Sequence, residues 1–312
     1  MAKEGGLGDN FFINGYDLSG DVGSVERIGG GPAAGDVTAI KSSANERIGL
    51  LRSGNMQFTN WFDYAAAQEH PVLSVLPYTD VLACYFHGSA IGNPAASIVA
   101  KQLNYDPTRD NVGNLSEKVD IESNGFGLEW GIQHTAGIRP DTTGTTGTAF
   151  DASAGATTPG VPLTTVPVTN TSPLPASVVI SGGTITQVFV NGVQVGTGAG
   201  TYIVPPGQTI SITYSVAPTW QWTYQSAFGA QSYLQVLSFT GTSITIKVRH
   251  SNDNSTYADL ITHTAVTAAR SFERQAVATN PVNKWTEVVT SGTFSQCSFI
   301  LAFVRNLTAV SF

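Results

Sequence analysis

The chain has 312 residues, of which 41% are apolar and only 12% are charged, with a formal net charge of −7 at pH 7. The charged share is about half the usual quarter, which favours short strands rather than solvent-exposed helices. The negative charge argues against binding of nucleic acid by phosphate neutralisation, because that needs a basic face. No apolar run approaches the ~18 residues of a membrane-spanning helix, so we expect no membrane insertion.

The ends of the chain and its cysteines favour a protein made in a reducing compartment. The first residues, Met-Ala-Lys-Glu-Gly-Gly, lack the apolar core of a secretion signal, so we expect the chain to stay in the cytosol after synthesis. Cys84 and Cys297 both lie in apolar segments. Two buried free thiols are therefore the expectation, rather than a disulfide.

Residues 152–222 contain no Asp, Glu, Lys or Arg, and this segment divides the chain. It opens with a turn-rich run of small residues, which is typical of a domain boundary. The flanks resemble each other in charge and aromatic content more than either resembles the middle. The sequence therefore predicts a small inserted all-β, Ig-like module at 160–218, within a larger β-domain built from 1–155 and 223–312, and the module is expected to project outward.

The first part of the chain begins with Asn14-Gly15 between apolar flanks, which predicts a two-residue hairpin turn. The glycine-rich segment 29–36 lacks core-forming residues and is predicted to be an exposed arm or contact loop. A strand is expected at 56–62. One helix is expected at 63–69, where an aspartate precedes an alanine run, and Pro71 limits it or restarts it as a short turn.

The segment 117–132 is predicted to be a β-hairpin that turns at Ser123-Asn-Gly125. Its apolar residues alternate on both arms, so Asp120, Glu122 and Glu129 are expected on the opposite side. A second hairpin is predicted at 233–248, around Thr240-Gly-Thr242. The late segment 298–304 is apolar on both faces and is expected to be a central strand.

Inside the charge-free segment, strands are predicted at 178–180, 186–190, 202–204 and 208–214, with a hairpin turn at Asn191-Gly192. Trp220, Trp222 and Tyr224 follow these strands. Exposed aromatic residues can stack on sugars, but such a group more often covers a junction between domains. Domain-junction aromatics are therefore the preferred interpretation.

No pattern in the chain predicts catalysis, a metal or a cofactor. The glycines at 196–200 lack the spacing of a nucleotide-binding loop, and His87-Gly-Ser89 is not a nucleophile elbow. The five histidines do not occur at metal-ligand spacing. We therefore expect a protein that is not an enzyme.

Five segments taken in order resemble one family: 15–23, 86–94, 124–130, 233–241 and 303–306. They are similar to segments of major tail proteins, the tail tube subunits of long-tailed, siphovirus-type phages of actinobacteria. The resemblance covers about 1–150 and 223–312. It implies a tail-tube β-sandwich with one flanking α-helix, hexameric rings that stack into a tube, and passage of viral DNA without specific binding.

The resemblance also implies partners and a location. The partners are other copies of the chain, a tape measure protein, a tail terminator and tail tip proteins, and the location is a virion tail assembled in the bacterial cytoplasm. Neutral and acidic side chains are then expected in the lumen, with Asp120, Glu122 and Glu129 as candidates. The candidates for contacts between rings are in the glycine-rich segment: Gly29, Gly30, Gly31, Pro32 and Asp36.

Two other function classes remain open at this point. A carbohydrate-binding virion or decoration protein would use 223–312 as a lectin-like sandwich, and it would be a monomer or trimer that binds glycan. A hydrolase is a more distant alternative, since it would need a catalytic group that the sequence does not show.

Overall fold

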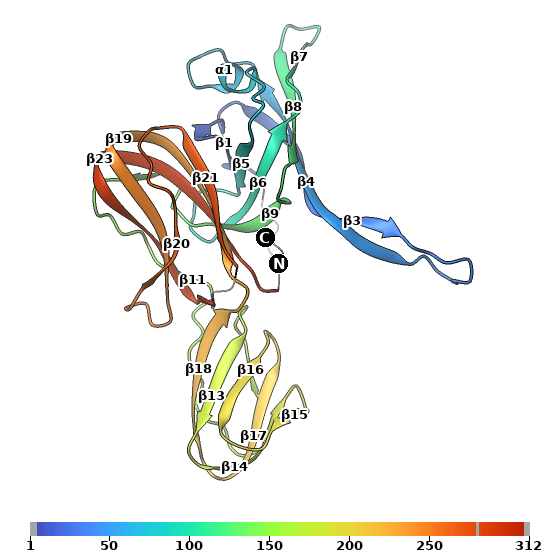
Figure 1. The fold of residues 1–312 in the computed structure, drawn as a ribbon, viewed down its shortest axis with the longest axis vertical. Coiled ribbons are helices and arrows are strands. Elements are labelled where there is room, and N and C mark those ends of the chain that lie inside the picture. The colour runs from blue at the N-terminus through green and yellow to red at the C-terminus, as the bar shows by residue number, and fades with distance from the viewer. Residues whose placement is uncertain (1–4, 279–280, 309–312) are drawn as a thin grey trace.

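The structure is a computed structural model that describes residues 5–278 and 281–308. It is mainly β, as predicted, and its one described helix is five residues long. Figure 1 shows a body of long strands, a two-stranded arm that projects from the body, and a separate β-sheet unit below it. No helix in the described ranges is long and apolar enough to cross a membrane.

One 15-stranded sheet runs through the body, and its central order is β2-β1-β5-β6-β9-β23-β19-β20. Strands from both flanks of the chain take part in it. Its members are β1 (Asn10–Ile13), β2 (Tyr16–Asp17), β3 (Val22–Asp36), β4 (Arg47–Trp61), β5 (Val81–Phe86), β6 (Pro94–Gln102), β7 (Asp106–Arg109), β8 (Leu115–Ser123), β9 (Glu129–Gln133), β10 (Arg139–Asp141), β11 (Phe150–Asp151), β19 (Ala230–Ser251), β20 (Ala258–Thr262), β21 (Ser271–Val277) and β23 (Trp285–Arg305).

The first strands form as their turn chemistry predicts. Asn14 and Gly15 both have positive φ, 50° and 77°, as a tight two-residue hairpin turn requires, and β1 pairs with β2 across them. β1 also pairs with β5, which in turn pairs with β6. Their inward side chains form a core with β4 and β8 that includes Phe11, Phe58 and Ile98.

The helix predicted at 63–69 is wrong in its position. The helix α1 spans Glu69–Leu73, and Ala67 before it has a left-handed φ of 67°. Pro71 lies in the first turn of α1, where a missing N–H and a fixed φ are tolerated, so the helix forms around the proline rather than on the alanine run. The backbone N–H of Glu69 donates to Asp21 Oδ2 at 3.0 Å, which satisfies one of the free amides of the first turn.

The hairpin predicted at 117–132 is also wrong. β8 and β9 do not pair with each other, and both run antiparallel to β6 along the same edge. Asn124 continues this pairing by donating its N–H to the Val99 carbonyl. Gly125, with φ of 77°, therefore lies in a short interruption between two collinear strands and does not reverse the chain.

The hairpin predicted around Thr240-Gly-Thr242 is a third correction. β19 continues through this segment as one 22-residue strand and pairs with β23 along its whole length. Gly241 has φ of 158°, and a Cβ there would lie 2.4 Å from Phe294 Cα, so glycine permits a β-bulge and a close approach of the two strands. The β19–β23 pairing has three register shifts, at Val236/Ser238, Thr240/Gly241 and Gly241/Ser243, and side chains from both halves of the pair form one core.

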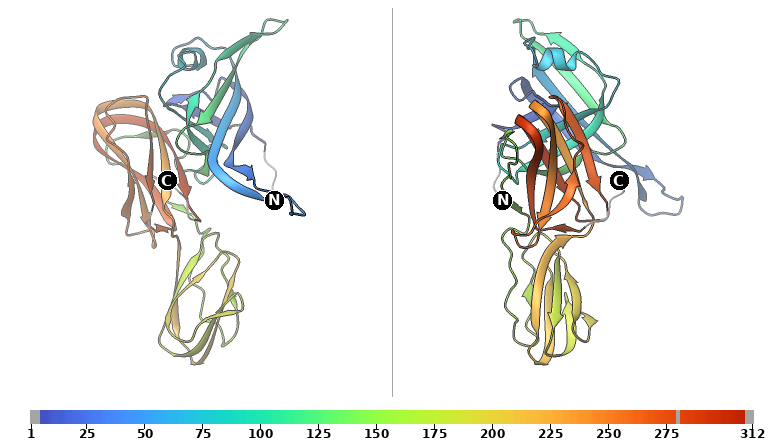
Figure 2. Two further views of the ribbon diagram at one scale, coloured as in Figure 1. Left: turned by 45° about the vertical axis from the view of Figure 1, so that its right-hand side comes forward. Right: turned by 60° about the vertical axis from the view of Figure 1, so that its left-hand side comes forward.

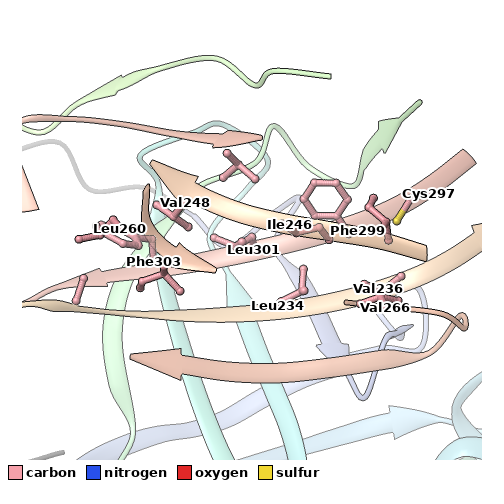
Figure 3. Close-up of a cluster of buried hydrophobic side chains, with 14 of the residues drawn as sticks. Leu234, Val236, Ile246, Val248, Leu260, Val266, Cys297, Phe299, Leu301 and Phe303 are labelled. Carbon is pink, nitrogen blue, oxygen red and sulfur yellow. The ribbon is translucent and has the colours of Figure 1, made fainter. Parts of the chain in front are cut away.

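That core lies within the part of the body built from β19, β20 and β23. Figure 3 shows side chains from these strands pointing toward one another, with Leu234, Ile246, Phe299 and Leu301 among them. The central strand predicted at 298–304 is confirmed within β23, because residues on both of its faces are buried. A further cluster joins the two flanks of the chain, since Phe12, Leu82 and Phe86 pack with Tyr233 and Ile300.

The middle of the chain folds into two sheets that we call the module, and the short strand β22 of the body pairs at the edge of one of them. One has the order β12-β17-β14-β15 and the other β16-β13-β18-β22. The strands are β12 (Val168–Thr169), β13 (Ala176–Ser181), β14 (Thr184–Val190), β15 (Val193–Gly196), β16 (Gly200–Val204), β17 (Thr209–Val216), β18 (Thr219–Ser226) and β22 (Val282–Asn283). Both views in Figure 2 show the module hanging from the body at one end.

The module extends beyond the predicted boundary at 218. β18 pairs with β13 from Ala176↔Tyr224 to Ser181↔Thr219, so its removal would open one of the two sheets. The Asn191-Gly192 turn is confirmed, with φ of 50° and 78° between β14 and β15. The body holds the module through β22, where Gln225 faces Asn283, and through Lys284 Nζ, which donates to the Ala156 carbonyl at 2.9 Å.

Candidate assembly surfaces

The arm consists of the outer parts of β3 and β4, residues 29–54. Its inner end continues into the body, where β4 pairs with β8 from Asn55↔Glu122 to Trp61↔Ser116. Farther out, β3 and β4 pair with each other only, and the arm projects clear of the body (Figure 1). Among the described residues, no further strand pairs with the outer arm.

Large apolar side chains lie exposed on this arm. Ile48 and Leu50 are about half exposed, at 50% and 51%, and Leu51 is 88% exposed. Ile48 and Leu50 lie on one face of β4, on either side of Gly49, and Leu51 lies on the opposite face. The Ile-x-Leu spacing is typical of one face of a strand, but no site was predicted here from the sequence. Isolated exposed apolar residues are ordinary, but a group of them on an unsupported hairpin is typical of a surface that another chain covers.

The segment 29–36, predicted to be an exposed arm or contact loop, lies in this arm, where it forms a strand rather than a loop. Gly29, Gly30 and Gly31 lie in β3 opposite Asn55, Gly54 and Ser53. Pro32 faces Arg52, and the register shifts directly after it because proline has no N–H for the ladder. Asp36 lies exposed at the outer end of β3, where its Oδ1 accepts hydrogen bonds from the backbone and the hydroxyl of Thr38.

Gly30 and Gly54 have a structural role at the arm base. They face each other across the hairpin, and a Cβ on either would lie within 2.9 Å of Leu128 Cβ, with 2.5 Å at Gly54. Two opposed glycines thus make room for the buried Leu128 side chain, which packs over the base of the arm. The glycine-rich composition of 29–36 reflects this close approach at one position, rather than a flexible loop.

The three candidate lumen residues lie in different surroundings. Asp120 is partly buried and Glu122 is exposed, and both belong to β8. The prediction that Glu129 points away from the apolar side is wrong, because its side chain is buried. It accepts a hydrogen bond from the Tyr233 hydroxyl and forms an ion pair with Arg274 at 3.4 Å. Glu129 thus links β9 to β19 and β21 inside the body.

Trp220, Trp222 and Tyr224 form part of the module core. All three are at least 93% buried among residues such as Val178 and Ile212, at 7%, 3% and 4% exposure. Trp220 Nε1 donates to the Pro159 carbonyl at 2.8 Å, and the Tyr224 hydroxyl donates to the Thr157 carbonyl at 2.9 Å. The segment that leads into the module, at Thr157 and Pro159, thus lies over these rings. Tyr224 is the one of the three that lies beside the body, since Lys284 Nζ is 5.7 Å from the centre of its ring.

A hydrogen-bond chain with the order of a catalytic triad lies in the body and was missed in the sequence. Ser232 Oγ lies 2.9 Å from His263 Nε2, and His263 Nδ1 lies 3.0 Å from Glu273 Oε2. Although burial raises the pKa of Glu273, hydrogen bonds from His263 and Thr264 outweigh it and hold the pKa at about 2. Ser232 and His263 are 0% and 1% exposed, so this arrangement has no access for a substrate and acts as a structural link between β19, β20 and β21.

Two buried carboxyl groups lie together beside α1. Glu69 and Glu117 are both fully buried, and burial, followed by the charge of Glu117, raises the pKa of Glu69 to about 8. Burial also raises the pKa of Glu117. No group of three or more His, Cys, Asp or Glu side chains among the described residues is arranged to hold a metal ion.

A groove lies where the module meets the body, and we call it the junction groove. Its volume is about 410 Å³. Its walls are mainly apolar: Trp130, Ile132, Phe150, Leu174, Phe303 and Leu307. Arg305 also lines it. The Nη1 of Arg305 donates to the Val282 carbonyl at 2.6 Å, and its buried Nη2 has no hydrogen-bond partner among the described residues.

Comparison with known proteins does not assign the chain to a family. No protein-family model matches the sequence, and no curated protein matches it either. Among solved structures, the Dit protein of phage SPP1, described as a paradigm of the hub adsorption apparatus in phages that infect Gram-positive bacteria, is similar over 96% of this chain and 99% of its own. The identity is 10% and the TM-score is 0.30.

Two structures of the phage p2 baseplate in its activated conformation, one with strontium and one with calcium, are similar to the same extent. Each covers 96% of this chain and 99% of the matched chain at 9% identity, with TM-scores of 0.31 and 0.30. Superpositions of this quality are too weak to carry an argument about function.

Proposed function

We propose that this chain is a structural subunit of a phage tail that polymerises as stacked rings, with six copies in a ring, to form the tail tube. The observation that carries the proposal is the arm, on which Ile48 and Leu50 are half exposed and Leu51 is 88% exposed among the described residues. The ordered resemblance to major tail proteins gives the class of assembly. DNA would pass through the tube without specific binding.

The energetics favour many simultaneous arm contacts. Burying one large apolar side chain contributes ~1.5–3 kcal/mol. Because Ile48 and Leu50 are already half buried, the three side chains together contribute roughly 3–6 kcal/mol, and association alone costs an estimated 4–15 kcal/mol. One arm contact would therefore be weak. A closed ring in which every copy gives one arm and receives another would be stable, because each copy is held twice.

The charge of the subunit fits a conduit. With −7 on each copy, the assembled wall carries no general attraction for phosphate. Asp120 and Glu122 on β8 remain the candidate lumen residues, whereas Glu129 would act inside the subunit through Tyr233 and Arg274. The proposed partners beyond other copies are a tape measure protein, a tail terminator and tail tip proteins, in a virion tail assembled in the bacterial cytoplasm.

A carbohydrate-binding role has less support from the side chains. The three aromatic residues that suggested a sugar platform, Trp220, Trp222 and Tyr224, are buried in the module core. Negative-stain electron microscopy together with a glycan-binding assay separates the two functions. Rings or tubes without glycan binding support the tail subunit, and monomers or trimers that bind glycan would contradict it.

A further inference from the structure

We propose that the segment between β4 and β5 is a pH-sensitive conformational switch, which is closed by a proton shared between Glu69 and Glu117 and opens when that proton is lost. We call residues 63–80 the α1 segment. It contains the helix α1 and no strand, and it lies at the end of the body away from the module (Figure 1). The switch is separate from the proposed tail assembly, because neither the arm nor the module takes part in it.

Two carboxyl groups are buried together under this segment. Glu69 of α1 and Glu117 of β8 are fully buried and lie within hydrogen-bonding reach of each other. None of their four carboxylate oxygens has a partner of normal hydrogen-bond geometry from another group among the described residues. The same is true of the buried side chain of Asn60, which lies opposite Glu117 in the β4–β8 pair and therefore points to the same face.

Such a pair has one favourable state, in which one carboxyl keeps a proton and donates it to the other. Burial, followed by the charge of Glu117, raises the pKa of Glu69 to about 8. Burial also raises the pKa of Glu117, and the hydrogen bond from Glu69 offsets part of that rise. Loss of the proton leaves two carboxylates side by side in the interior, where neither is solvated.

The other titratable groups around Glu69 do not neutralise this charge. Asp21, from the loop after β2, accepts the backbone N–H of Glu69 at 3.0 Å, and its charge raises the pKa of Glu69 further. The backbone of Asp63 and the Tyr105 hydroxyl lower that pKa without outweighing burial. His70 Nδ1 lies 2.8 Å from the Tyr105 hydroxyl, and it is the one group here that can become a cation at low pH.

The backbone of the α1 segment favours local opening once the pair is charged. Ala67 and Leu76, on either side of α1, have left-handed φ values of 67° and 45°. Residues other than glycine keep such values only where their surroundings hold them. The remaining attachments include the buried Leu73 side chain and the hydrogen bond from Gln102 Nε2 to the Leu73 carbonyl at 2.8 Å. A segment with so few attachments opens more readily than the strands beside it.

Hydrogen exchange with mass spectrometry at pH 6 and pH 9, corrected for the intrinsic exchange rate, tests the switch. In the closed segment Glu69 has a pKa of about 8, and in the open segment its pKa returns toward the ordinary 4.5. The closed state is therefore favoured at low pH and loses that advantage as the pH rises through 8. Opening of residues 63–80 should increase roughly 50- to 100-fold between pH 6 and pH 9. Residues 81–86 in β5 should stay protected at both pH values.

Variants assign the effect to the carboxyl pair. Glu69→Gln cannot ionise, so it should abolish the increase at pH 9 although His70 is still present. Glu117→Gln removes the neighbouring charge and should reduce the increase. Glu122→Gln, at an exposed position on the same strand as Glu117, is the control and should behave as the wild type.

Three results would overturn the switch. One is exchange of residues 63–80 that does not change between pH 6 and pH 9. Another is an increase that persists in both Glu69→Gln and Glu117→Gln, which would assign it to a different group. The third is loss of protection in residues 81–86 together with the α1 segment, because the body would then unfold as a whole rather than open locally.

Discussion

Glu69 illustrates how one residue far from the arm sets the response of the fold to pH. Its carboxyl is fully buried beside Glu117, with Asp21 and Asp63 also near, and no ion pair to a described Lys or Arg joins it. Burial, then the Glu117 charge, raises its pKa from 4.5 to about 8, so the folded state keeps a proton that the unfolded state releases. The contribution of Glu69 to the free energy of unfolding is therefore most favourable below pH 4.5, and it is lost as the pH rises toward 8.

We predict that Glu69→Gln stabilises the protein at pH 8 by roughly 2–4 kcal/mol and has little effect at pH 4.5, because glutamine cannot ionise. Urea unfolding of the variant and the wild type at both pH values measures the difference. Glu122→Gln, at an exposed position on β8, is the control and should give a difference within about 0.5 kcal/mol at both. An equal effect of Glu69→Gln at the two pH values would show that Glu69 does not keep its proton.

Gly54 gives a second prediction at the scale of one residue. Gly54→Ala places a Cβ 2.5 Å from Leu128 Cβ and 2.6 Å from Leu128 N, and we expect it to cost about 1–3 kcal/mol because the backbone must move. Gly49→Ala is the matched control on the same strand, since its Cβ would meet Pro32 at an ordinary 3.6 Å. Chemical unfolding of both variants checks the difference. Equal stability of the two would mean that Leu128 does not fix the arm base.

At the scale of elements, the arm is a two-stranded hairpin supported by β8 only at its inner end. An isolated hairpin is marginally stable in water, because its ladder is open to solvent on both sides. We predict that amides of 33–52 exchange rapidly in the monomer and are protected at least tenfold in the assembled state. Hydrogen exchange with mass spectrometry measures this, and 81–86 in β5 provides a protected reference. Equal protection of the arm in both states would contradict a role in assembly.

The elements also separate what local sequence predicts from what it does not. Turn chemistry decides the hairpins at Asn14-Gly15 and Asn191-Gly192, because both central residues must adopt positive φ. The same glycine signal failed at Gly125 and Gly241. There the chain does not reverse, because β6 and β23, distant in sequence, offer a pairing edge to both sides of the interruption. Long-range pairing therefore overrides a local turn preference.

The candidate site was predicted in part for similar reasons. The low apolar content of residues 29–36 correctly indicated that their side chains are exposed. Their conformation was not predicted, because it is the pairing with β4 that makes this segment a strand. Alternation placed Glu129 outward, whereas the interruption at 124–128 changes the register and turns its side chain toward Tyr233 and Arg274. The groove around Arg305 could not be predicted, because its walls come from segments of both flanks and the module.

At the scale of the whole molecule, the module is a separate unit. A deletion can remove it cleanly only if the deleted segment includes all strands of its core. Deleting 160–218 would leave β18 without β13 and expose Trp220 and Trp222, so we predict insoluble protein. Deleting 157–224, bridged by a Gly-Ser linker, removes the module core completely and should give soluble protein that forms thinner tubes. Electron microscopy measures the tube width. Failure of the longer deletion to assemble, in a folded and soluble protein, would mean that the module belongs to the tube wall.

Self-assembly through the arm is the central claim, and sedimentation velocity over a range of concentrations tests it most directly. In the test variant, an Asn-Gly turn replaces 32–52 and joins the opposed residues Gly31 and Ser53, so the body keeps its pairing with β8. The wild type should sediment as rings or larger stacks as concentration rises, and the shortened variant should remain a folded monomer. A wild type that stays monomeric at high concentration, or a shortened variant that assembles equally well, would contradict the account.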